Sequence, residues 1–422
     1  MLLKEKSKQI VYSLVIGMIL PFTTIYAKQP AFTLSYFDKL TVPDSTKLSD
    51  SLKLGNTFKD NRPLSFPDSV AFYATKDAEE SPQCLILYLK SKLHTQDGMI
   101  RAIYTWISHN INYNIYTTFK SRNEEINEKK EIREVWKNRK GTCREYAILF
   151  RYLAETAGFA AFIINGYNKE GKTILPNPHQ WCAAQINGKW YLFDPTWGAG
   201  YVENYQFIPA LNYRYFMLSP EQIQQTHMPF DPLWQFKEHP LSYDEFDTGK
   251  SDSLHLMPFF NWKDTLNRYL KQDTLQRLNG IKTRIMSNGN KNELVNYTLH
   301  LVEANIQIAH SAQIINAFNQ AMNLQCEAVD SINIFIRYRN SAFEPLFSEE
   351  RIKLMVDIPE KLINQADSTI NTIREVSPKY REPILKLRQV IIDVASQIYT
   401  QKLFLKQYFS IPPKQRKSLF RR

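Results

Sequence analysis

The chain contains a cysteine, a histidine and an aspartate whose types and order suit thiol-based acyl transfer. They are Cys143, His179 and Asp194, in the segments GTCREYA, HQWCAAQ and WYLFDPTWG. A free cysteine has a pKa of about 8.5 and is a weak nucleophile until a helix N-terminus or an imidazolium stabilises its thiolate. These residues therefore predict Cys143 as the nucleophile, His179 as general base and then acid, and Asp194 as the group that orients the imidazole.

Cys143 is predicted to open a helix. Gly141 and Thr142 offer a turn and an N-cap, and apolar residues then recur at three- and four-residue steps up to Gly158, namely Tyr146, Phe150, Leu153 and Ala157. The unpaired N–H groups in the first turn of a helix carry partial positive charge. The sequence thus predicts a helix end that stabilises the thiolate of Cys143 and supplies backbone donors for an oxyanion.

The histidine and the aspartate are predicted to lie on one β-hairpin. Asn187-Gly188 is a dipeptide favoured in two-residue type I′ turns between antiparallel strands. Counting back from this turn places Trp181 opposite Asp194, with His179 on the same face of the strand as Trp181. His179 and Asp194 are then diagonal neighbours with backbones about 7–8 Å apart, which allows a hydrogen bond between imidazole and carboxylate.

These segments resemble the transglutaminase-like superfamily, whose papain-like core carries cysteine, histidine and aspartate in this order. The family patterns G-x-C-x-x-Y-A, H-x-W and G-K-W-Y-x-x-D-P-T-W occur at residues 141–147, 179–181 and 188–197. RAIYTWISHNINYN, at 101–114, looks like the helix and strand that precede the cysteine in bacterial members and in the kyphoscoliosis peptidase branch. SPEQIQQTHMPFDPLWQ, at 219–235, is also similar to that branch.

The resemblance implies an α+β fold over roughly residues 80–240. In this papain-like core the helix carrying the cysteine packs on an antiparallel sheet carrying the histidine and the aspartate. The backbone N–H of Cys143 is the expected half of the oxyanion site. Trp106 and Tyr113 are candidates for the second donor, with core packing as the alternative for both, and Trp181 is a candidate for the cleft.

Two residues beside the nucleophile depart from the family pattern. Bacterial relatives commonly have a small residue where Glu145 stands, and Arg144 next to it is also unusual. These side chains could narrow the cleft, pair with each other or select a charged substrate. They leave the substrate class open.

The N-terminus is typical of an export signal. Lys4, Lys6 and Lys8 precede an apolar run over residues 10–26, and the favoured cleavage point follows Ala27. The sequence therefore predicts an exported bacterial protein, in the periplasm or outside the cell. The alternative is a protein anchored in the membrane by this apolar segment.

Cysteine usage and charge argue against several other classes. The four cysteines, Cys84, Cys143, Cys182 and Cys326, are too sparse for a disulfide framework and form no zinc pattern. No calcium loop is recognisable, so we expect no metal and no cofactor. The net charge of +11 in 422 residues is concentrated partly in the last nine residues. We expect no nucleic-acid partner, and membrane contact only through an uncleaved signal or this basic tail.

The chain is predicted to contain five segments. They are a signal peptide at 1–27, a linker or N-terminal extension at 28–75, the transglutaminase-like domain at 76–245, a helical C-terminal domain at 246–413 and the basic tail at 414–422. Helices are expected at 81–93 and 97–110, a strand at 160–164, and a rim or lid at 120–131. Apolar stripes at helical spacing predict packed helices in the C-terminal domain, at 295–309, 362–373 and 384–398.

Two functional hypotheses follow. The first is an exported thiol enzyme that attacks a peptide or carboxamide carbonyl, forms a thioester on Cys143 and passes the acyl group to water. Transfer to an amine, as in cross-linking transglutaminases, is the less favoured outcome because no acceptor site is recognisable. The partner of this exported enzyme would be a protein or peptide substrate, for example a protein of the cell envelope. The second is a catalytically inactive module that keeps the fold to bind cell-envelope protein or wall ligands.

Overall fold

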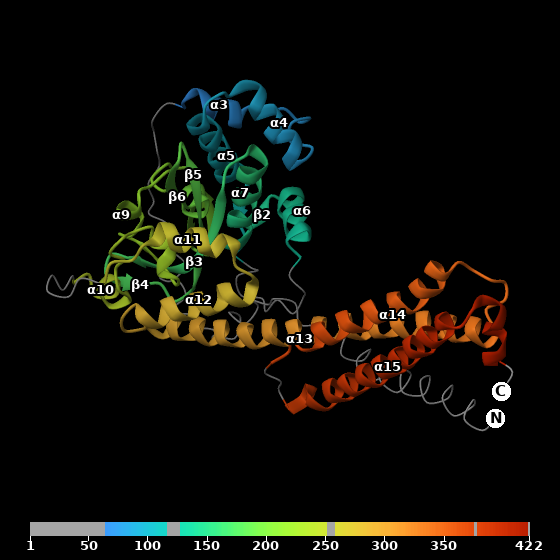
Figure 1. Cartoon of the computed structure of the whole chain (residues 1–422). Helices are drawn as coiled ribbons and strands as arrows, with labels where there is room; N and C mark the ends of the chain where they lie inside the picture. Colours follow the sequence, from blue (N-terminus) through green and yellow to red (C-terminus); the bar gives the residue numbers. More distant parts are fainter. Residues whose placement is uncertain (1–63, 116–126, 251–257, 375–377, 421–422) are drawn as a thin grey trace. The chain divides into compact units, whose positions relative to one another are not determined.

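The computed structural model describes residues 64–115, 127–250, 258–374 and 378–420. Within them the chain divides into two compact units, one ending at Ile306 and the other beginning at Gln307 (Figure 1). The domain boundary expected after residue 245 thus lies inside the first unit. The expected signal peptide, and most of the segments expected to form the linker and the lid, lie outside the described residues.

Five helices come first in the described part of the first unit. They are α3 (Phe66–Phe72), α4 (Pro82–Lys92), α5 (Gln96–Asn110), α6 (Glu128–Asn138) and α7 (Cys143–Ala157). α4 and α5 confirm the two helices expected here, and Ile100, Ile103 and Ile107 are all buried on α5. Between them and α7, β1 (Asn112–Tyr113) pairs in parallel with β2 (Lys140–Gly141). The nucleophile candidate therefore follows a strand pairing that anchors the start of α7.

α3 joins this folded unit, although the sequence indicated a linker up to residue 75. Val70 and Ala71 are buried in the core that α4, α5 and α7 share. The fully buried carboxylate of Asp68 accepts hydrogen bonds from the Arg101 guanidinium at 2.8 and 2.7 Å and from the Thr105 hydroxyl at 2.9 Å. The ion pair between the buried Asp68 carboxylate and Arg101 fixes α3 on α5. A short helix without strong periodicity gives no such signal in the sequence.

The sheet of the first unit is antiparallel. Its strands are β3 (Ala161–Glu170), β4 (Thr173–Ile174), β5 (His179–Ile186), β6 (Lys189–Phe193) and β9 (His227–Pro229). The order is β4-β3-β5-β6, and β9 pairs with β3. The register of β5 on β6, from Ile186 opposite Lys189 to Cys182 opposite Phe193, confirms the predicted hairpin. Asn187 and Gly188 both have positive φ, 49° and 77°, as a type I′ turn requires.

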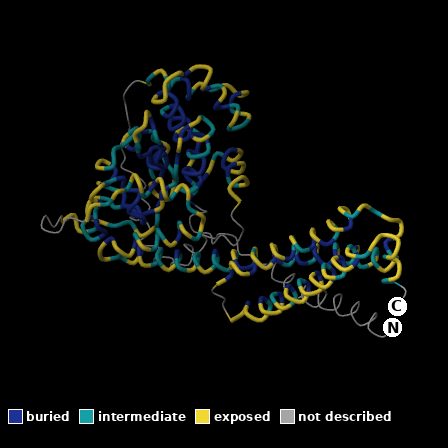
Figure 2. Tube along the Cα trace, viewed as in Figure 1, coloured by how far each residue is buried: buried dark blue, intermediate teal, exposed yellow. Residues whose placement is uncertain are grey.

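Both faces of the sheet are covered. On one face α7 packs against β5 and β3, and the Cys182 thiol lies 3.5 Å from the Ala147 carbonyl oxygen of α7. On the other face Trp181 and Leu192 pack against Leu233 and Leu266. Figure 2 shows that the strands of the sheet are buried or half-buried along most of their length. The predicted α+β class of this core is therefore confirmed.

The remaining elements of the first unit are short, apart from its last helices. They are α8 (Pro195–Ala199), β7 (Gly200–Glu203), β8 (Gln206–Pro209), α9 (Pro220–Ile223), η3 (Pro232–Gln235), α10 (Tyr243–Thr248), α11 (Trp262–Lys271) and α12 (Thr274–Ser287). α13 (Glu293–Asn340) follows and crosses the boundary between the two units.

The second unit is helical, as predicted. α14 (Glu349–Ile370) and α15 (Pro378–Ser410) pack with the second part of α13 around a separate hydrophobic core. The stripe expected at 384–398 is buried at all five of its positions, Ile384, Leu387, Ile391, Val394 and Ile398. Pro359 lies inside α14 and Pro383 inside α15.

The basic tail is largely folded onto this unit. η4 (Pro413–Phe420) covers most of it, and Arg416 and Lys417 form ion pairs with Glu349 at 2.7 Å and Glu344 at 2.9 Å. Part of its positive charge is therefore matched within the chain. Among the described residues, no helix combines the length and the apolar character that crossing a bilayer requires.

Candidate active site

The three residues singled out in the sequence stand at the starts or ends of rigid elements. Cys143 is the first residue of α7, His179 is the first residue of β5, and Asp194 follows β6 directly and caps α8. The His179 Nε2 atom lies 2.7 Å from Asp194 Oδ2, and Cys143 is among the groups that raise the pKa of His179. The predicted pairing of His179 with Asp194 is therefore present, and the triad that includes Cys143 stays a prediction.

Asp194 is fixed by four donors. Its Oδ1 atom accepts the backbone N–H groups of Thr196 at 2.9 Å and Trp197 at 3.1 Å, and its Oδ2 atom faces His179 and His227. The residue is fully buried. Burial alone would raise the pKa of Asp194, but the charge and hydrogen bond of His179, with those of His227, hold this pKa well below its usual range. The carboxylate is therefore charged across the pH range in which proteins function.

His179 is the group whose protonation Asp194 controls. Burial would lower the pKa of His179, but the charge and hydrogen bond of Asp194 outweigh burial and, together with Cys143, raise this pKa well above its ordinary value. The imidazolium form is thus favoured around neutral pH. An imidazolium next to a thiol at a helix N-terminus is the arrangement that stabilises a thiolate.

His227 is a site residue that the sequence did not single out. It lies on β9, is fully buried, and its Nε2 atom is 3.1 Å from the same Asp194 oxygen that His179 contacts. Burial lowers the pKa of His227, with Asp194 opposing this shift. The one signal in the sequence was its place in the segment at 219–235. Without the pairing of β9 with β3, nothing in that segment indicates proximity to Asp194.

Two indoles border the imidazole of His179. The ring of Trp181 is nearly parallel to it with centroids 6.2 Å apart, and the ring of Trp197 lies at 5.8 Å. Both tryptophans are almost completely buried. They limit the access of water to the imidazole and so strengthen its interaction with Asp194. Trp181 therefore lies beside His179, and its part in a substrate cleft stays a prediction.

Trp106 is not placed to serve as an oxyanion donor, which corrects one expectation. Its indole N–H donates to Glu79 Oε1 at 2.8 Å, and its ring stacks on Trp136 with centroids 4.5 Å apart. The alternative of core packing is the one observed. Tyr113 lies on β1 opposite Gly141, which stands two residues before Cys143. Tyr113 therefore stays a candidate for the second oxyanion donor.

Arg144 and Glu145 do not pair with each other. The Arg144 guanidinium donates to Glu131 of α6 at 3.1 Å, so it holds α6 against the start of α7. The Glu145 carboxylate turns back along its own helix and accepts hydrogen bonds from the N–H group and the hydroxyl of Thr142, at 2.7 and 2.6 Å. This is a capping box. Glu145 is therefore a capping residue of the helix that carries the thiol.

Replacing Glu145 with alanine is expected to lower the free energy of unfolding by about 1 kcal/mol, because the Thr142 N–H group loses its acceptor at a helix start. Urea denaturation measures the change. Glu155→Ala is the matched control on the same helix, since that carboxylate only makes a 3.4 Å ion pair with Arg151 near the C-terminus. Equal stability of the wild type and Glu145→Ala would contradict the capping role.

His179, Asp194 and His227 also have the composition of a metal site. One ligand atom from each lies within 4.8 Å of the other two, and all three residues are buried. In this structure both imidazoles direct Nε2 at Asp194 Oδ2, at 2.7 and 3.1 Å. These are hydrogen-bond distances, so a proton between each imidazole nitrogen and the carboxylate oxygen accounts for the arrangement of the three side chains.

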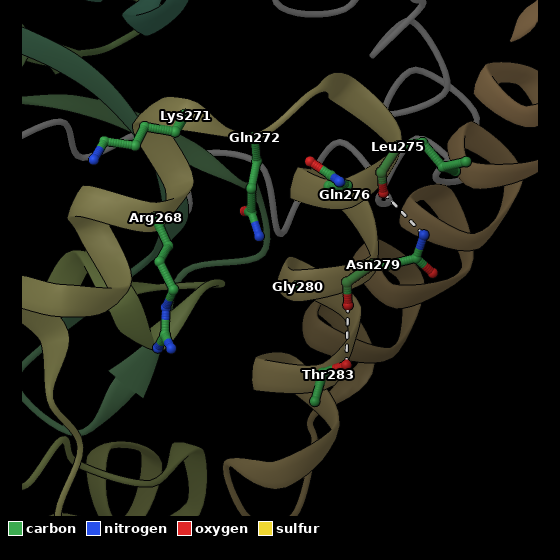
Figure 3. Close-up of a pocket in the computed structure, with 8 residues that line it drawn as sticks. All are labelled: Arg268, Lys271, Gln272, Leu275, Gln276, Asn279, Gly280 and Thr283. Carbon is green, nitrogen blue, oxygen red and sulfur yellow. Dashed lines mark hydrogen bonds between the residues drawn. The ribbon is translucent and has the colours of Figure 1, made fainter.

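A groove lies away from these residues, between α11 and α12. Its volume is about 650 Å³, and none of the site residues lines it. Figure 3 shows Arg268 and Lys271 on α11, with polar side chains such as Asn279 and Thr283 on α12. The Asn279 and Thr283 side chains each donate to the backbone of α12. The groove is separate from the candidate active site.

Comparison with known proteins supports the resemblance noted in the sequence. Residues 87–195 match the family model of the transglutaminase-like superfamily. The chain is 28% identical over 207 residues to kyphoscoliosis peptidase of Homo sapiens and 27% identical over 207 residues to that of Mus musculus. Each match covers 47% of this chain and 30% of the relative. It is also 26% identical over 199 residues to the Lim and transglutaminase domain protein ltd-1 of Caenorhabditis elegans, covering 43% of this chain and 27% of the relative.

Solved structures give weaker matches. A chain from Cytophaga hutchinsonii described as a candidate cysteine protease is 24% identical, with a TM-score of 0.22, over 32% of this chain and 43% of that one. A structure of a TGase is 16% identical, with a TM-score of 0.22, over 36% of this chain and 38% of that one. The chain spans less than a third of the length of the curated relatives it matches.

Proposed function

From the premise that residues 87–195 form a transglutaminase-like domain, we propose that the chain is an exported thiol hydrolase acting on peptide or carboxamide bonds. The observation that carries the proposal is the position of His179. Its Nε2 atom lies 2.7 Å from the carboxylate of Asp194, whose negative charge favours the imidazolium, and Cys143 is near enough to raise the pKa of His179 further. This arrangement supplies a nucleophile, an acid and base, and an orienting group.

In the proposed reaction the Cys143 thiolate attacks the carbonyl carbon, and a C–S bond forms as the carbonyl electron pair moves to oxygen. The imidazolium of His179 gives its proton to the leaving nitrogen, the C–N bond breaks, and a thioester remains on Cys143. Neutral His179 then takes a proton from water while the water oxygen attacks the thioester. The C–S bond breaks, the carboxylic acid leaves, and the thiolate and imidazolium are restored.

The start of α7 supports the first of these steps. Cys143 is the first residue of a helix of 15 residues, so its backbone N–H is among the unpaired donors of the first turn. Such a donor can hold the oxyanion that forms when the thiolate attacks. Tyr113 is the candidate we retain for the second donor, since β1 pairs with β2 next to this turn.

Hydrolysis is the outcome we favour over transfer to an amine. Two of the relatives are peptidases by name, and one is named for its transglutaminase domain. We propose a protein or peptide substrate, for example one of the cell envelope, because the N-terminal sequence is typical of export. The alternative remains a catalytically inactive module that binds envelope or wall ligands.

The rate of alkylation of Cys143 against pH tests the proposal. The imidazolium of His179 persists above neutral pH, because its pKa is raised by Asp194. We therefore expect a reactive thiolate well below pH 7, at a pH where an ordinary cysteine with a pKa of about 8.5 is protonated. Peptide mass mapping assigns the label to Cys143 in the full chain.

His179→Ala is the control, and it should return Cys143 to the pH profile of an ordinary thiol. Cys326, which is half-buried and far along the sequence on α13, reports the reactivity of an unactivated thiol in the same sample. An ordinary profile for Cys143 that the control leaves unchanged would support the binding module instead.

A further inference from the structure

We propose that His227 is a positioning residue that holds the Asp194 carboxylate, and through it the ring of His179, in the orientation that the reaction needs. This inference rests on the proposed function. The two imidazoles meet at one carboxylate oxygen, Asp194 Oδ2, at 2.7 Å from His179 and 3.1 Å from His227. The hydrogen bond between His227 and the predicted triad goes to Asp194, and the ring of His227 also lies 5.6 Å from that of His179.

The hydrogen bonds of His227 determine which of its nitrogens carries the proton. A charged carboxylate can only accept, so the Nε2 atom facing Asp194 must be the donor. The Nδ1 atom lies 2.7 Å from the Thr226 hydroxyl, which can donate to it in place of its longer, 3.4 Å contact with the Ile223 carbonyl oxygen. A neutral ring with hydrogen on Nε2 satisfies both contacts. Thr226 therefore fixes the tautomer of His227 in the way that Asp194 fixes that of His179.

The backbone delivers His227 with little freedom. β9 pairs with β3, with His227 opposite Asn168 and Pro229 opposite Gly166. A β-carbon at Gly166 would lie 2.1 Å from the Met228 carbonyl oxygen, so only glycine allows β9 to approach β3 this closely. The two strands thus present the imidazole to Asp194 from a rigid part of the sheet.

The neutral state of His227 distinguishes it from His179. Of the ionisable groups around it, Asp194 is negative and His179 positive, while burial raises the pKa of Tyr215 to about 12 and keeps that phenol neutral. The other neighbours are uncharged, namely the rings of Trp181 and Trp197, the Thr226 hydroxyl and the Asn168 amide, which lies 3.4 Å from Nε2. As a neutral N–H donor, His227 partly neutralises the carboxylate of Asp194. It does so without placing a second positive charge beside the imidazolium of His179.

Losing the donor has two expected effects. The carboxylate keeps its two backbone N–H groups but loses one of the two partners on Oδ2, so its plane and the ring of His179 are less well fixed. Without the hydrogen bond from His227, the negative charge of the Asp194 carboxylate also stabilises the imidazolium of His179 more strongly. The rate should fall, and the alkaline limb of the pH profile, where His179 loses its proton, should move to higher pH.

The test compares His227→Leu with His227→Gln in the full chain, using kcat, KM and the pH dependence of kcat/KM on a peptide substrate, and the pH profile of Cys143 alkylation. Leucine removes the N–H donor, and we expect kcat to fall about 10- to 100-fold with KM little changed. Glutamine can place an N–H group where Nε2 stands, and it should return kcat to within a few-fold of the wild type. Thr226→Val, which leaves the imidazole in place but frees its tautomer, should give an intermediate loss.

Several outcomes would overturn the inference. If glutamine and leucine lower kcat equally with unshifted pH profiles, His227 only fills space. If zinc ions raise the activity of the wild type and a chelator removes it, the cluster is a metal site. If the leucine variant keeps its activity and profile, Asp194 needs no second imidazole. Failure of the proposed function itself is distinguishable, because then the wild type alone would already have an ordinary thiol profile.

Discussion

Replacing Cys143 with alanine is expected to remove acyl-transfer activity by about 10⁵-fold or more, because no other group near His179 can form the thioester. The fold should be retained. Cys143 is only partly buried and is not a member of the hydrophobic core around α7, so its truncation should leave no large cavity. Turnover of a peptide substrate measures the loss of activity. Circular dichroism and thermal denaturation measure whether the fold is retained.

Matched variants separate this effect from the loss of any thiol. Cys84→Ala and Cys326→Ala remove partly buried cysteines on α4 and α13, and they should leave turnover unchanged. Activity that survives in Cys143→Ala would exclude the thioester mechanism. It would assign the observed turnover to another group or to a contaminant.

Asp194→Asn is expected to lower kcat by about 10³- to 10⁴-fold, less completely than loss of the thiol. The asparagine oxygen can still accept the N–H groups of Thr196 and Trp197. Its NH₂ group then faces His179, which must accept through Nε2 and carry its proton on the other nitrogen. That nitrogen is the one available to Cys143, so the ring can no longer act as its base.

Asp231→Asn is a suitable control for this substitution. Asp231 is also a buried aspartate at the start of a short helix, where it accepts the Leu233 N–H at 3.1 Å and pairs with Arg284 at 2.7 Å. The Asp231→Asn substitution should lower the free energy of unfolding without a matching loss of kcat. If both variants lower kcat in proportion to their loss of stability, the effect of Asp194 would be structural and its orienting role would be wrong.

The parts of the fold and of the candidate site that the sequence predicted depend on local rules. The cap at Thr142, the apolar spacing of α7 and the left-handed Gly158 define one helix within seventeen residues. The Asn187-Gly188 turn sets the register that brings His179 towards Asp194, since the strands on both sides are adjacent in sequence. In each case a short segment contains all the information needed.

The parts that were missed depend on contacts between distant segments. His227 reaches Asp194 only because β9 pairs with β3 across about sixty residues, and no periodicity in either strand indicates that pairing. Trp106 was a reasonable donor candidate until Glu79, on a loop before α4, proved to hold its N–H. For Glu145, the capping-box pattern with Thr142 was present in the sequence, but the alternatives considered for it were narrowing the cleft, pairing with Arg144 and selecting a charged substrate.

β9 also bears on how this domain can be divided. The family model ends at residue 195, whereas β9 begins at His227 and covers part of the outer edge of β3. A fragment cut at the end of the matched segment would leave the N–H and C=O groups of β3 around residues 166–168 without partners, and unprotected strand edges of this kind recruit other chains into aggregates. The smallest soluble fragment therefore has to extend at least through β9, which would also keep His227.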